Sequence, residues 1–495
     1  EVVLPMDQVF VGDGETQQFN QSSGGGSLYD YAYQSLAGRF NYDFGGKYLA
    51  EFVFRYDASS RFPSGDLRWV FFPSVSVGWR ISEENFWKES SLDFIENLKI
   101  RASYGKTGDD SGLYYEFLTG FTYPSGGAIL GGDYINGSVP KDIANKRITW
   151  YTLKTLDIGL DFSAWNGKLG LTFDYFRRHC DGLYARRNLS LPGSVGASLP
   201  LENLNSDRDT GFELELSHRN RVGDFSYVVK GNVSFTRRKT LYYERAESGN
   251  SYLNWRQNNN DRFNSIWWGY GEGGRITSWD QLYYNPVYIG RGSVMGDYLY
   301  EDWNGDGWIN DLDVHPIGYT DMVPMVNFGL TISASWKGID FSMLWQGSGN
   351  RYIIAREFLQ EPLWSRTNAI SEHMDRWHPA DPTANPYDPA TKWVAGEYGY
   401  TGSTANPNSE HGLQNARYLR LKNLEIGYSL PKKWLTKVGI ENVRIYASAY
   451  NLLTITGLDY LDPEFYIHPS DGGASNMGYF YPINKTYTIG LNVKF

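Results

Sequence analysis

Along most of its length, the chain alternates apolar and polar residues one for one. Between residues 326 and 336, every second position is apolar, and the positions between carry small polar residues or glycine. The apolar set is Val326, Phe328, Leu330, Ile332, Ala334 and Trp336. Because successive side chains of a β-strand point to opposite faces, this period predicts a strand with one apolar face. The same alternation resumes after Lys337-Gly338, where Leu344 is its exception.

Short turn signals join such segments in pairs. Asn166-Gly167 is a favoured hairpin turn, and alternating segments lead into it and out of it. Gly45-Gly46-Lys47, Arg219 to Asp224 and Lys337-Gly338 occupy equivalent places. Together these segments predict an all-β chain of about thirteen antiparallel strands.

Short and long connections alternate along the chain. The long ones are predicted at residues 107–150, 180–208, 237–325 and 347–415. Compact soluble domains rarely hold several unstructured connections of that length, whereas transmembrane barrels combine short periplasmic turns with long extracellular loops. The pattern therefore favours a transmembrane antiparallel β-barrel over a soluble β-sandwich, whose strands also alternate.

Composition excludes several other classes of protein. No stretch approaches the roughly 18 uninterrupted apolar residues of a membrane-spanning helix, so a helical membrane protein is excluded. Aromatic residues near strand ends suit the aromatic belts of a membrane interface, although an aromatic-rich soluble core would also explain some of them; they are Tyr48, Tyr56, Phe162, Trp165, Trp336 and Trp345. A formal net charge of −10, without a basic stripe, argues against a nucleic-acid partner. The single cysteine, Cys180, excludes an internal disulfide.

The predicted strand number is odd, whereas bacterial single-chain barrels have even strand numbers and no open edge. The sequence also begins Glu-Val-Val-Leu-Pro, without a Met, a basic region or an apolar leader. We therefore expect that upstream sequence, including further strands, is missing.

The last segment, residues 486–495, alternates strictly and ends on an aromatic residue. Tyr487 and Phe495 are the first and last members of its apolar set. This ending resembles the terminal signal by which outer-membrane proteins are inserted.

One long motif resembles a known family. Residues 417–434 read Arg-Tyr-Leu-Arg-Leu-Lys-Asn-Leu-Glu-Ile-Gly-Tyr-Ser-Leu-Pro-Lys-Lys-Trp, which is similar to the penultimate hairpin of SusC-like TonB-dependent transporters. Other similar segments, in the order that the family shows, are 48–62, 78–82, 98–105, 444–454, 461–464 and 485–495. The resemblance spans nearly the whole chain.

The resemblance implies the C-terminal part of a 22-stranded outer-membrane barrel, residues 1–495, with a signal peptide, a TonB-contacting segment, a plug domain and the first strands upstream. It implies an importer of oligosaccharides or, alternatively, of peptides. Its partners would be a SusD-like surface lipoprotein and the TonB complex, in a dimer of transporter–lipoprotein pairs. A non-transporting adhesin or structural barrel and a passive porin are the alternatives from other classes.

A calcium-type loop is predicted within residues 296–318. Asp302, Asn304, Asp306 and Asp313 supply oxygen donors at positions 1, 3, 5 and 12, Gly307 stands at position 6, and Trp308 offers its backbone carbonyl. Position 12 is Asp instead of the usual Glu, and no paired helices flank the loop, so any calcium would be structural. The alternative is an Asx-rich turn held by its own hydrogen bonds.

The long connections are rich in aromatic residues beside amides, a composition that suits sugar binding. The candidate ligand- or partner-binding residues are Trp267, Trp268, Trp279, Tyr283, Trp364 and Trp393. The alternative is that these rings pack the loops on each other and on a partner protein.

No enzymatic site is predicted. Residues 269–274 satisfy GxGxxG, but no buried strand precedes them and no helix follows, so we predict a flexible loop and no dinucleotide site. His373 and His378 are five residues apart, which is not a helical metal-ligand spacing. There is no Ser-His-Asp order, Walker motif or defensible carboxylate pair.

Overall fold

One large antiparallel sheet dominates the computed structural model. The structure describes residues 31–111, 115–122, 127–140, 142–188, 198–288, 293–319, 324–355, 359–360, 362–363, 368–400, 408–435, 439–458, 461–464 and 483–495. Within these ranges, thirteen strands pair in sequence order, and short β13 (Arg262–Phe263) adds to β12 outside this path. The thirteen are β1 (Tyr33–Phe44), β2 (Tyr48–Ser59), β3 (Trp69–Arg80), β4 (Ile95–Asp109), β9 (Tyr151–Ala164), β10 (Leu169–Arg186), β11 (Leu201–Val222), β12 (Phe225–Tyr242), β20 (Val326–Trp336), β21 (Ile339–Gly349), β26 (Tyr418–Ser429), β27 (Asn442–Thr456) and β28 (Thr486–Lys494). The predicted fold class and strand number are confirmed.

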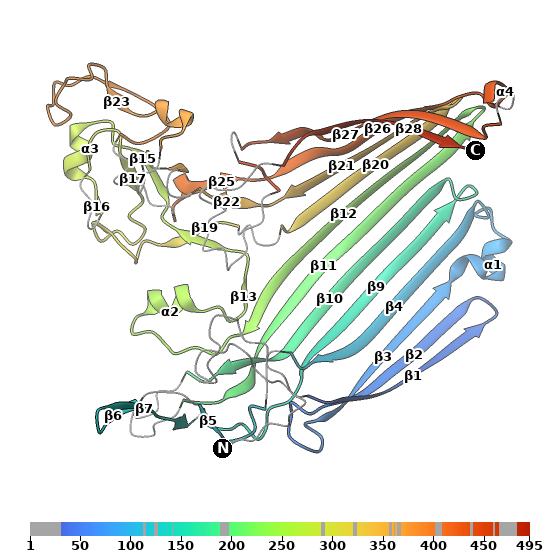
Figure 1. Cartoon of the computed structure of the whole chain (residues 1–495), viewed down its shortest axis with the longest axis horizontal. Helices are drawn as coiled ribbons and strands as arrows, with labels where there is room; N and C mark the ends of the chain where they lie inside the picture. Colours follow the sequence, from blue (N-terminus) through green and yellow to red (C-terminus); the bar gives the residue numbers. More distant parts are fainter. Residues whose placement is uncertain are drawn as a thin grey trace.

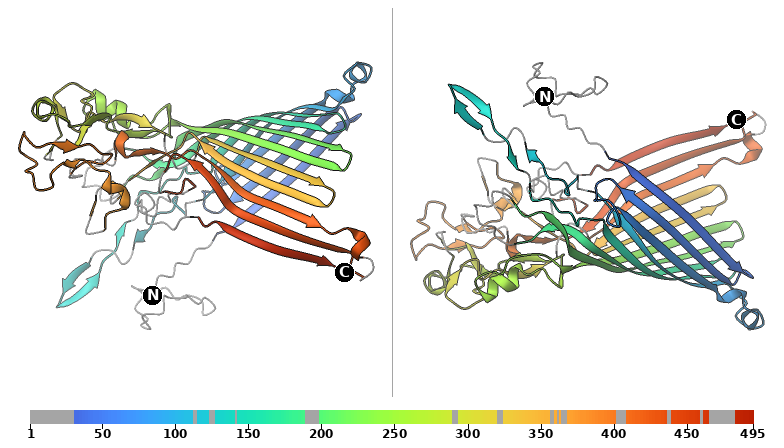
Figure 2. Two further views of the ribbon diagram at one scale, coloured as in Figure 1. Left: turned by 90° about the horizontal axis from the view of Figure 1, so that it is seen from above. Right: turned by 90° about the horizontal axis from the view of Figure 1, so that it is seen from below.

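The sheet curls into a trough whose strands all lean in one direction (Figures 1 and 2). The short turns gather at one end of the trough, together with the C-terminus, and the long connections gather at the other. No helix among the described residues is long and apolar enough to cross a membrane.

The outer face of the sheet is apolar across strand boundaries. One row of facing residues runs Ala50, Val77, Ala102, Ile158, Tyr175, Phe212, Phe235 and Val326 across eight neighbouring strands. Many rings and aliphatic groups of this face are exposed, among them Phe40 at 64% and Ile489 at 85%. Tyr48, Trp165 and Trp336 lie exposed at the turn end, as the predicted aromatic belt requires. Such a face is stable when lipid covers it.

The inner face is polar, and several of its charges form ion pairs. The Arg101 guanidinium lies 3.2 Å from Asp157, 3.3 Å from Asp161 and 2.5 Å from Asp174. Leu344, the exception to the alternation, lies on this inner face opposite Thr331. Because the polar set of every strand points inward, the trough has a hydrophilic interior.

The short turns contain residues in left-handed backbone conformations, which allow a hairpin to close within a few residues. Trp165 and Asn166 have φ of 56° and 57°, in the left-handed region that asparagine tolerates. Two turn-end connections carry helical turns instead. These are η1 (Ile81–Glu83) and α1 (Asn85–Lys88) before β4, and α4 (Lys432–Leu435) before β27.

The predicted bounds of the long connections are wrong by several residues, because the strands continue past the apolar alternation. β10 and β11 stay paired through residues predicted to be loop, so the connection between them is 187–200 instead of 180–208. The other three are 110–150, 243–325 and 350–417. Strand ends that leave the lipid no longer need apolar outer residues, but the backbone ladder continues. A further long connection, 457–485, was not predicted.

These connections carry their own short elements. The 110–150 loop holds β5 (Phe121–Thr122), β6 (Gly127–Leu130), β7 (Asp133–Asn136) and β8 (Val139–Pro140). The 243–325 loop holds α2 (Ser251–Gln257), β13, β14 (Trp267–Gly269), β15 (Glu272–Arg275), α3 (Trp279–Tyr284), β16 (Val287–Tyr288), β17 (Tyr298–Tyr300), β18 (Trp308–Ile309) and β19 (His315–Gly318). The 350–417 loop holds β22 (Tyr352–Ile354), η5 (Ser371–Met374), β23 (His378–Pro379), β24 (Trp393–Val394), η6 (Glu410–Gly412) and β25 (Leu413–Asn415).

Candidate functional site

The 243–325 and 350–417 loops fold together into one lobe beyond the strand ends (Figure 1). Tyr270 forms a β-bridge with Ser409, its N–H donates to the Asn408 carbonyl at 3.0 Å, and its carbonyl accepts from Glu410 N–H at 3.0 Å. The lobe has its own apolar core of buried side chains, which are Tyr270, Tyr298, Tyr300, Ile309 and Val314. Two segments far apart in sequence are therefore held as one body.

Gly269 allows this close approach. A side chain at Gly269 would collide with the backbone carbonyl of Asn408. Gly269 belongs to β14, and the residues after it lead into β15. The predicted flexible loop at 269–274 is thus wrong, because Gly269 packs β14 against the 350–417 loop, while Gly271 and Gly273 pack against Glu301 and Leu299 within the 243–325 loop.

A contact between Arg275 and His411 joins the 243–325 loop to the 350–417 loop. The Arg275 guanidinium lies 3.8 Å from the Tyr298 ring centre, and its Nη2 donates to the Glu397 carbonyl at 2.6 Å. The same nitrogen lies 3.1 Å from His411 Nδ1. Burial, followed by the charge of Arg275, lowers the pKa of His411 to about 3. His411 is therefore neutral at physiological pH and accepts a hydrogen bond from Arg275.

The predicted calcium loop is a tight turn on the same lobe. The Asp302 carboxylate accepts hydrogen bonds from the N–H groups of Gly305 and Gly307 at 2.8 Å each. Gly307 has φ of 84°, which the sharp turn requires. These are the hydrogen bonds expected of an Asx-rich turn.

The donor chemistry of this turn also fits calcium. Asp313 is fully buried, its carboxylate accepts two backbone N–H groups, and within the described part of the chain it has no ion pair. Buried carboxylates are ordinarily paired with a cation. In the described ranges no three Asp, Glu, His or Cys side chains converge, so ligation would also draw on Asn304 and the Trp308 carbonyl.

The candidate aromatic residues do not converge on one site. Trp268 packs against the apolar core of the lobe, with Trp255 edge-on to it at 5.0 Å between ring centres. Trp393 packs on Tyr400, and Trp279 lies near Tyr283 on α3. Tyr283 is 76% exposed. Trp267 is half-buried, and Trp364 lies outside the described residues.

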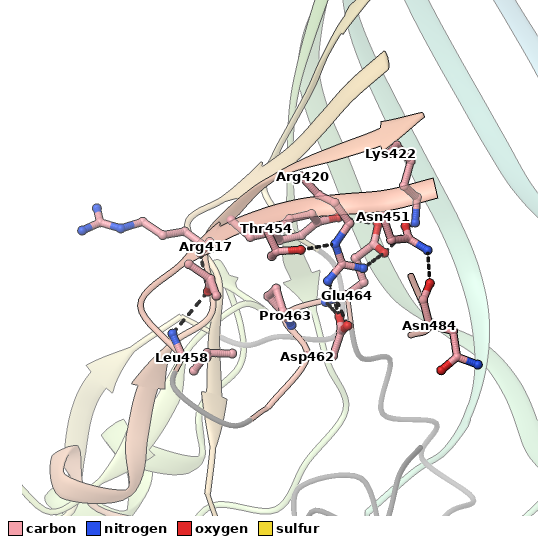
Figure 3. A network of polar contacts seen from close by, with 12 residues as sticks. Arg417, Arg420, Lys422, Asn451, Thr454, Leu458, Asp462, Pro463, Glu464 and Asn484 are labelled. Atoms are coloured by element: carbon pink, nitrogen blue, oxygen red, sulfur yellow. Dashed lines mark hydrogen bonds and ion pairs between the residues drawn. The ribbon is translucent and has the colours of Figure 1, made fainter. Parts of the chain in front are cut away.

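Sequence reasoning missed an ion-pair network where β26 begins and β27 ends (Figure 3). Arg420 is 2% exposed, and its Nη2 donates to both Asp462 oxygens at 2.8 and 2.9 Å. Its Nη1 reaches Glu464 at 2.5 Å, and Nε donates to Thr454 at 2.9 Å. Lys422 also contacts Glu464, at 2.6 Å.

This network, Arg420, Lys422, Asp462 and Glu464, fastens the start of the 457–485 loop to the inner wall. Arg351 adds a hydrogen bond to the Pro463 carbonyl from the neighbouring 350–417 loop. In the sequence, the segments 417–434 and 461–464, which contain these four residues, supported only the family resemblance. The signal that could have found the network is an arginine on the inward set of β26 followed, more than forty residues later, by two closely spaced acids.

The comparisons with known proteins decide the family. A family model described as TonB dependent receptor-like, beta-barrel, matches residues 7–336. The chain belongs to this family. The TonB-dependent receptors are outer-membrane proteins, so the apolar outer face lies in lipid and the long loops are extracellular.

Its curated relatives confirm the SusC-like resemblance. "TonB-dependent receptor P3" of Formosa agariphila is 31% identical over 485 residues, which cover 93% of this chain and 45% of that protein. "TonB-dependent receptor SusC" of Bacteroides thetaiotaomicron is 28% identical over 476 residues, which cover 93% of this chain and 43% of that protein. The chain thus spans about half the length of these TonB-dependent receptors.

A solved structure shares the fold. The RagAB peptide transporter superposes with a TM-score of 0.69 at 22% identity, over 94% of this chain and 48% of that chain. The transmembrane antiparallel β-barrel fold, predicted from the alternation and the connection lengths, is confirmed.

Proposed function

We propose that this chain forms the barrel wall of an active outer-membrane importer that takes up oligosaccharides. The observation that carries the proposal is the SusC-type relationship over 93% of the chain. A hydrophilic interior and a folded extracellular lobe, both built from this chain, suit a route for polar solutes.

Three partners belong to the proposal. A SusD-like lipoprotein covers the extracellular mouth, the TonB complex supplies energy through upstream sequence, and two such transporter–lipoprotein pairs associate. Exposed Tyr283 and Tyr284 on α3, at the far edge of the lobe, offer rings to a protein placed over the mouth.

Peptides are the second candidate substrate. The RagAB protein, whose fold this chain shares, is a peptide transporter, and that likeness concerns the fold. Strand patterns do not separate the two substrate classes, because substrate contacts come from loops.

Uptake by cells that carry the full-length protein tests the proposal. Labelled neutral oligosaccharides and labelled short peptides would be offered with and without a protonophore, and the receptor would be purified gently to identify co-purifying lipoproteins. We expect oligosaccharide uptake that stops without the proton gradient. Uptake that persists would indicate a passive porin, and no uptake of either substrate would indicate an adhesin.

We also propose that calcium binds the 302–313 turn as a structural ion. The residues that would hold it are Asp302, Asn304, Asp306, Asp313 and the Trp308 carbonyl. Calorimetric titration with CaCl₂ should show one site that Asp313→Asn abolishes. If wild-type and variant proteins both release no heat, the turn is held by its hydrogen bonds alone.

A further inference from the structure

A groove of about 530 Å³ lies at the extracellular mouth, between the ends of β10–β12 and the 243–325 loop. Small-molecule sites commonly measure about 300–1,000 Å³. Its lining includes Asp207, Thr240, Tyr243, Asn259, Arg262, Asn264 and Trp268. Of these, only Trp268 belongs to the aromatic residues singled out from the sequence.

The strands place the polar wall of the groove toward the barrel interior. Asp207 alternates with the outward-facing apolar set of β11 and pairs with Thr240 across the ladder. Asn264 fixes this edge, because its Oδ1 accepts from Thr240 N–H at 3.0 Å and from the Thr240 hydroxyl at 2.6 Å. A solute entering the barrel from outside would pass this wall.

The loop wall of the groove is held rigid. The Arg262 guanidinium lies 5.0 Å from the Trp268 ring centre and 5.6 Å from that of Trp255. Its Nη1 and Nη2 donate to the carbonyls of Arg256 and Trp255 at 2.9 and 2.5 Å. Both terminal nitrogens are thus engaged, so Arg262 supports the wall and offers little to an anion.

Several polar groups of the groove are open to a ligand. Within the described part of the chain, the side chains of Asp207 and Asn259 have no hydrogen-bond or ion-pair partner, and the side-chain Nδ2 of Asn264 donates to no protein group. These atoms combine acceptors and donors in one groove. Tyr243, 45% exposed, adds a ring on which an apolar face can rest.

We propose that this groove binds sugar units of a neutral oligosaccharide on its way into the barrel. The inference rests on the proposed function and adds a binding site to it. A pyranose presents hydroxyls that both donate and accept at its edge, and C–H groups on its face. The Asp207, Asn259 and Asn264 groups match the edge, and the exposed ring of Tyr243 matches the face. Asp207 lies within electrostatic reach of Arg238, which is paired with Asp209, and the Arg262 guanidinium is engaged by carbonyls, so no cation among the lining residues is left to hold an acidic sugar or a phosphate.

The test uses the full-length protein in detergent and a panel of neutral tri- to hexasaccharides of glucose, xylose, mannose and galactose. Binding would be measured by calorimetry for the wild type and for Tyr243→Ala, Asn259→Ala and, as a control at an exposed ring of the other loop, Tyr387→Ala. Tyr243 and Asn259 are exposed, so their truncation leaves the fold intact. We expect at least one sugar to bind, tenfold or more weaker binding in the two groove variants, and unchanged binding in Tyr387→Ala.

Unchanged affinity in both groove variants would overturn the proposal, as would a panel in which no sugar binds. Binding of short peptides with the same dependence on Tyr243 and Asn259 would assign the groove to peptides and also overturn it. The uptake assay distinguishes failure of the groove proposal from failure of the importer proposal. Energised oligosaccharide uptake that survives both groove substitutions refutes the groove alone, whereas a wild type that imports nothing refutes the importer.

Discussion

Replacing Arg420 with methionine should release the start of the 457–485 loop from the barrel wall. The guanidinium side chain is 3% exposed, and those of Asp462 and Glu464 are 11% and 10% exposed. Removing one partner of a buried ion pair costs about 3–5 kcal/mol, because the other charge is left uncompensated. Lys422 stays beside Glu464, so we expect the lower end, about 3 kcal/mol. Since 1.4 kcal/mol is a factor of ten, local opening should become about a hundredfold more frequent.

Hydrogen–deuterium exchange of the full-length protein would measure this opening in peptides that cover residues 454–464 and 351–355. Arg417→Met is the matched control, because Arg417 is exposed and its side chain points away from the network (Figure 3). Adding Asp462→Asn to Arg420→Met should restore part of the protection, since the unpaired charge is removed. Equal protection in wild type and Arg420→Met, or equal loss in Arg417→Met, would refute the reasoning.

Three further outcomes are expected. Because the pKa of His411 is about 3 when folded, and the unfolded imidazole takes up a proton near its ordinary value of 6.5, the unfolded lobe binds more protons between these values. The lobe should therefore be fully stable above pH 6.5, and its free energy of unfolding should fall by about 1.4 kcal/mol per pH unit below that value. Hydrogen–deuterium exchange of the lobe, corrected for the pH dependence of intrinsic exchange rates, would measure this slope, and His411→Asn should remove it. Gly269→Val should destabilise the lobe by about 1–3 kcal/mol, measured by exchange at residues 408–412, whereas Gly249→Val, with open space around it, should not. Phe173→Arg, on the lipid face, should lower the free energy of unfolding by about 2–4 kcal/mol, seen as a lower unfolding temperature in heat-modifiability assays. Thr172→Arg, beside the inner acids Asp174, Glu213 and Glu215, should be tolerated. Equal effects of the two substitutions would contradict the assignment of the two faces.

The barrel wall could be predicted because its rules are local. Alternation fixes which residues face lipid, and short turn signals such as Asn166-Gly167 fix the pairing of neighbours. Even the exception was visible, since Leu344 breaks the pattern in the sequence and lies on the inner face in the structure. Strand ends were less visible, because the pattern fades where lipid no longer selects apolar residues.

The lobe and the groove could not be predicted because their contacts join distant segments. Tyr270 meets Ser409, and Arg275 meets His411, over separations at which no periodicity in the sequence relates the two residues. Most of the tryptophans that suggested a binding surface proved to pack in separate pairs. The groove instead depends on Asp207 and Asn259, which do not stand out in the sequence. They are recognised as candidate binding residues only because the fold brings them to the same groove.

The joint folding of two loops limits how such receptors can diversify. A graft of the 243–325 loop alone from a relative would replace Arg275 and Tyr270 while leaving His411 and Ser409 without their counterparts. New specificities should therefore be exchanged as cassettes that include both loops and the strands β20 and β21 between them. Chimeras with one loop exchanged are expected to reach the membrane as intact barrels that carry a disordered lobe.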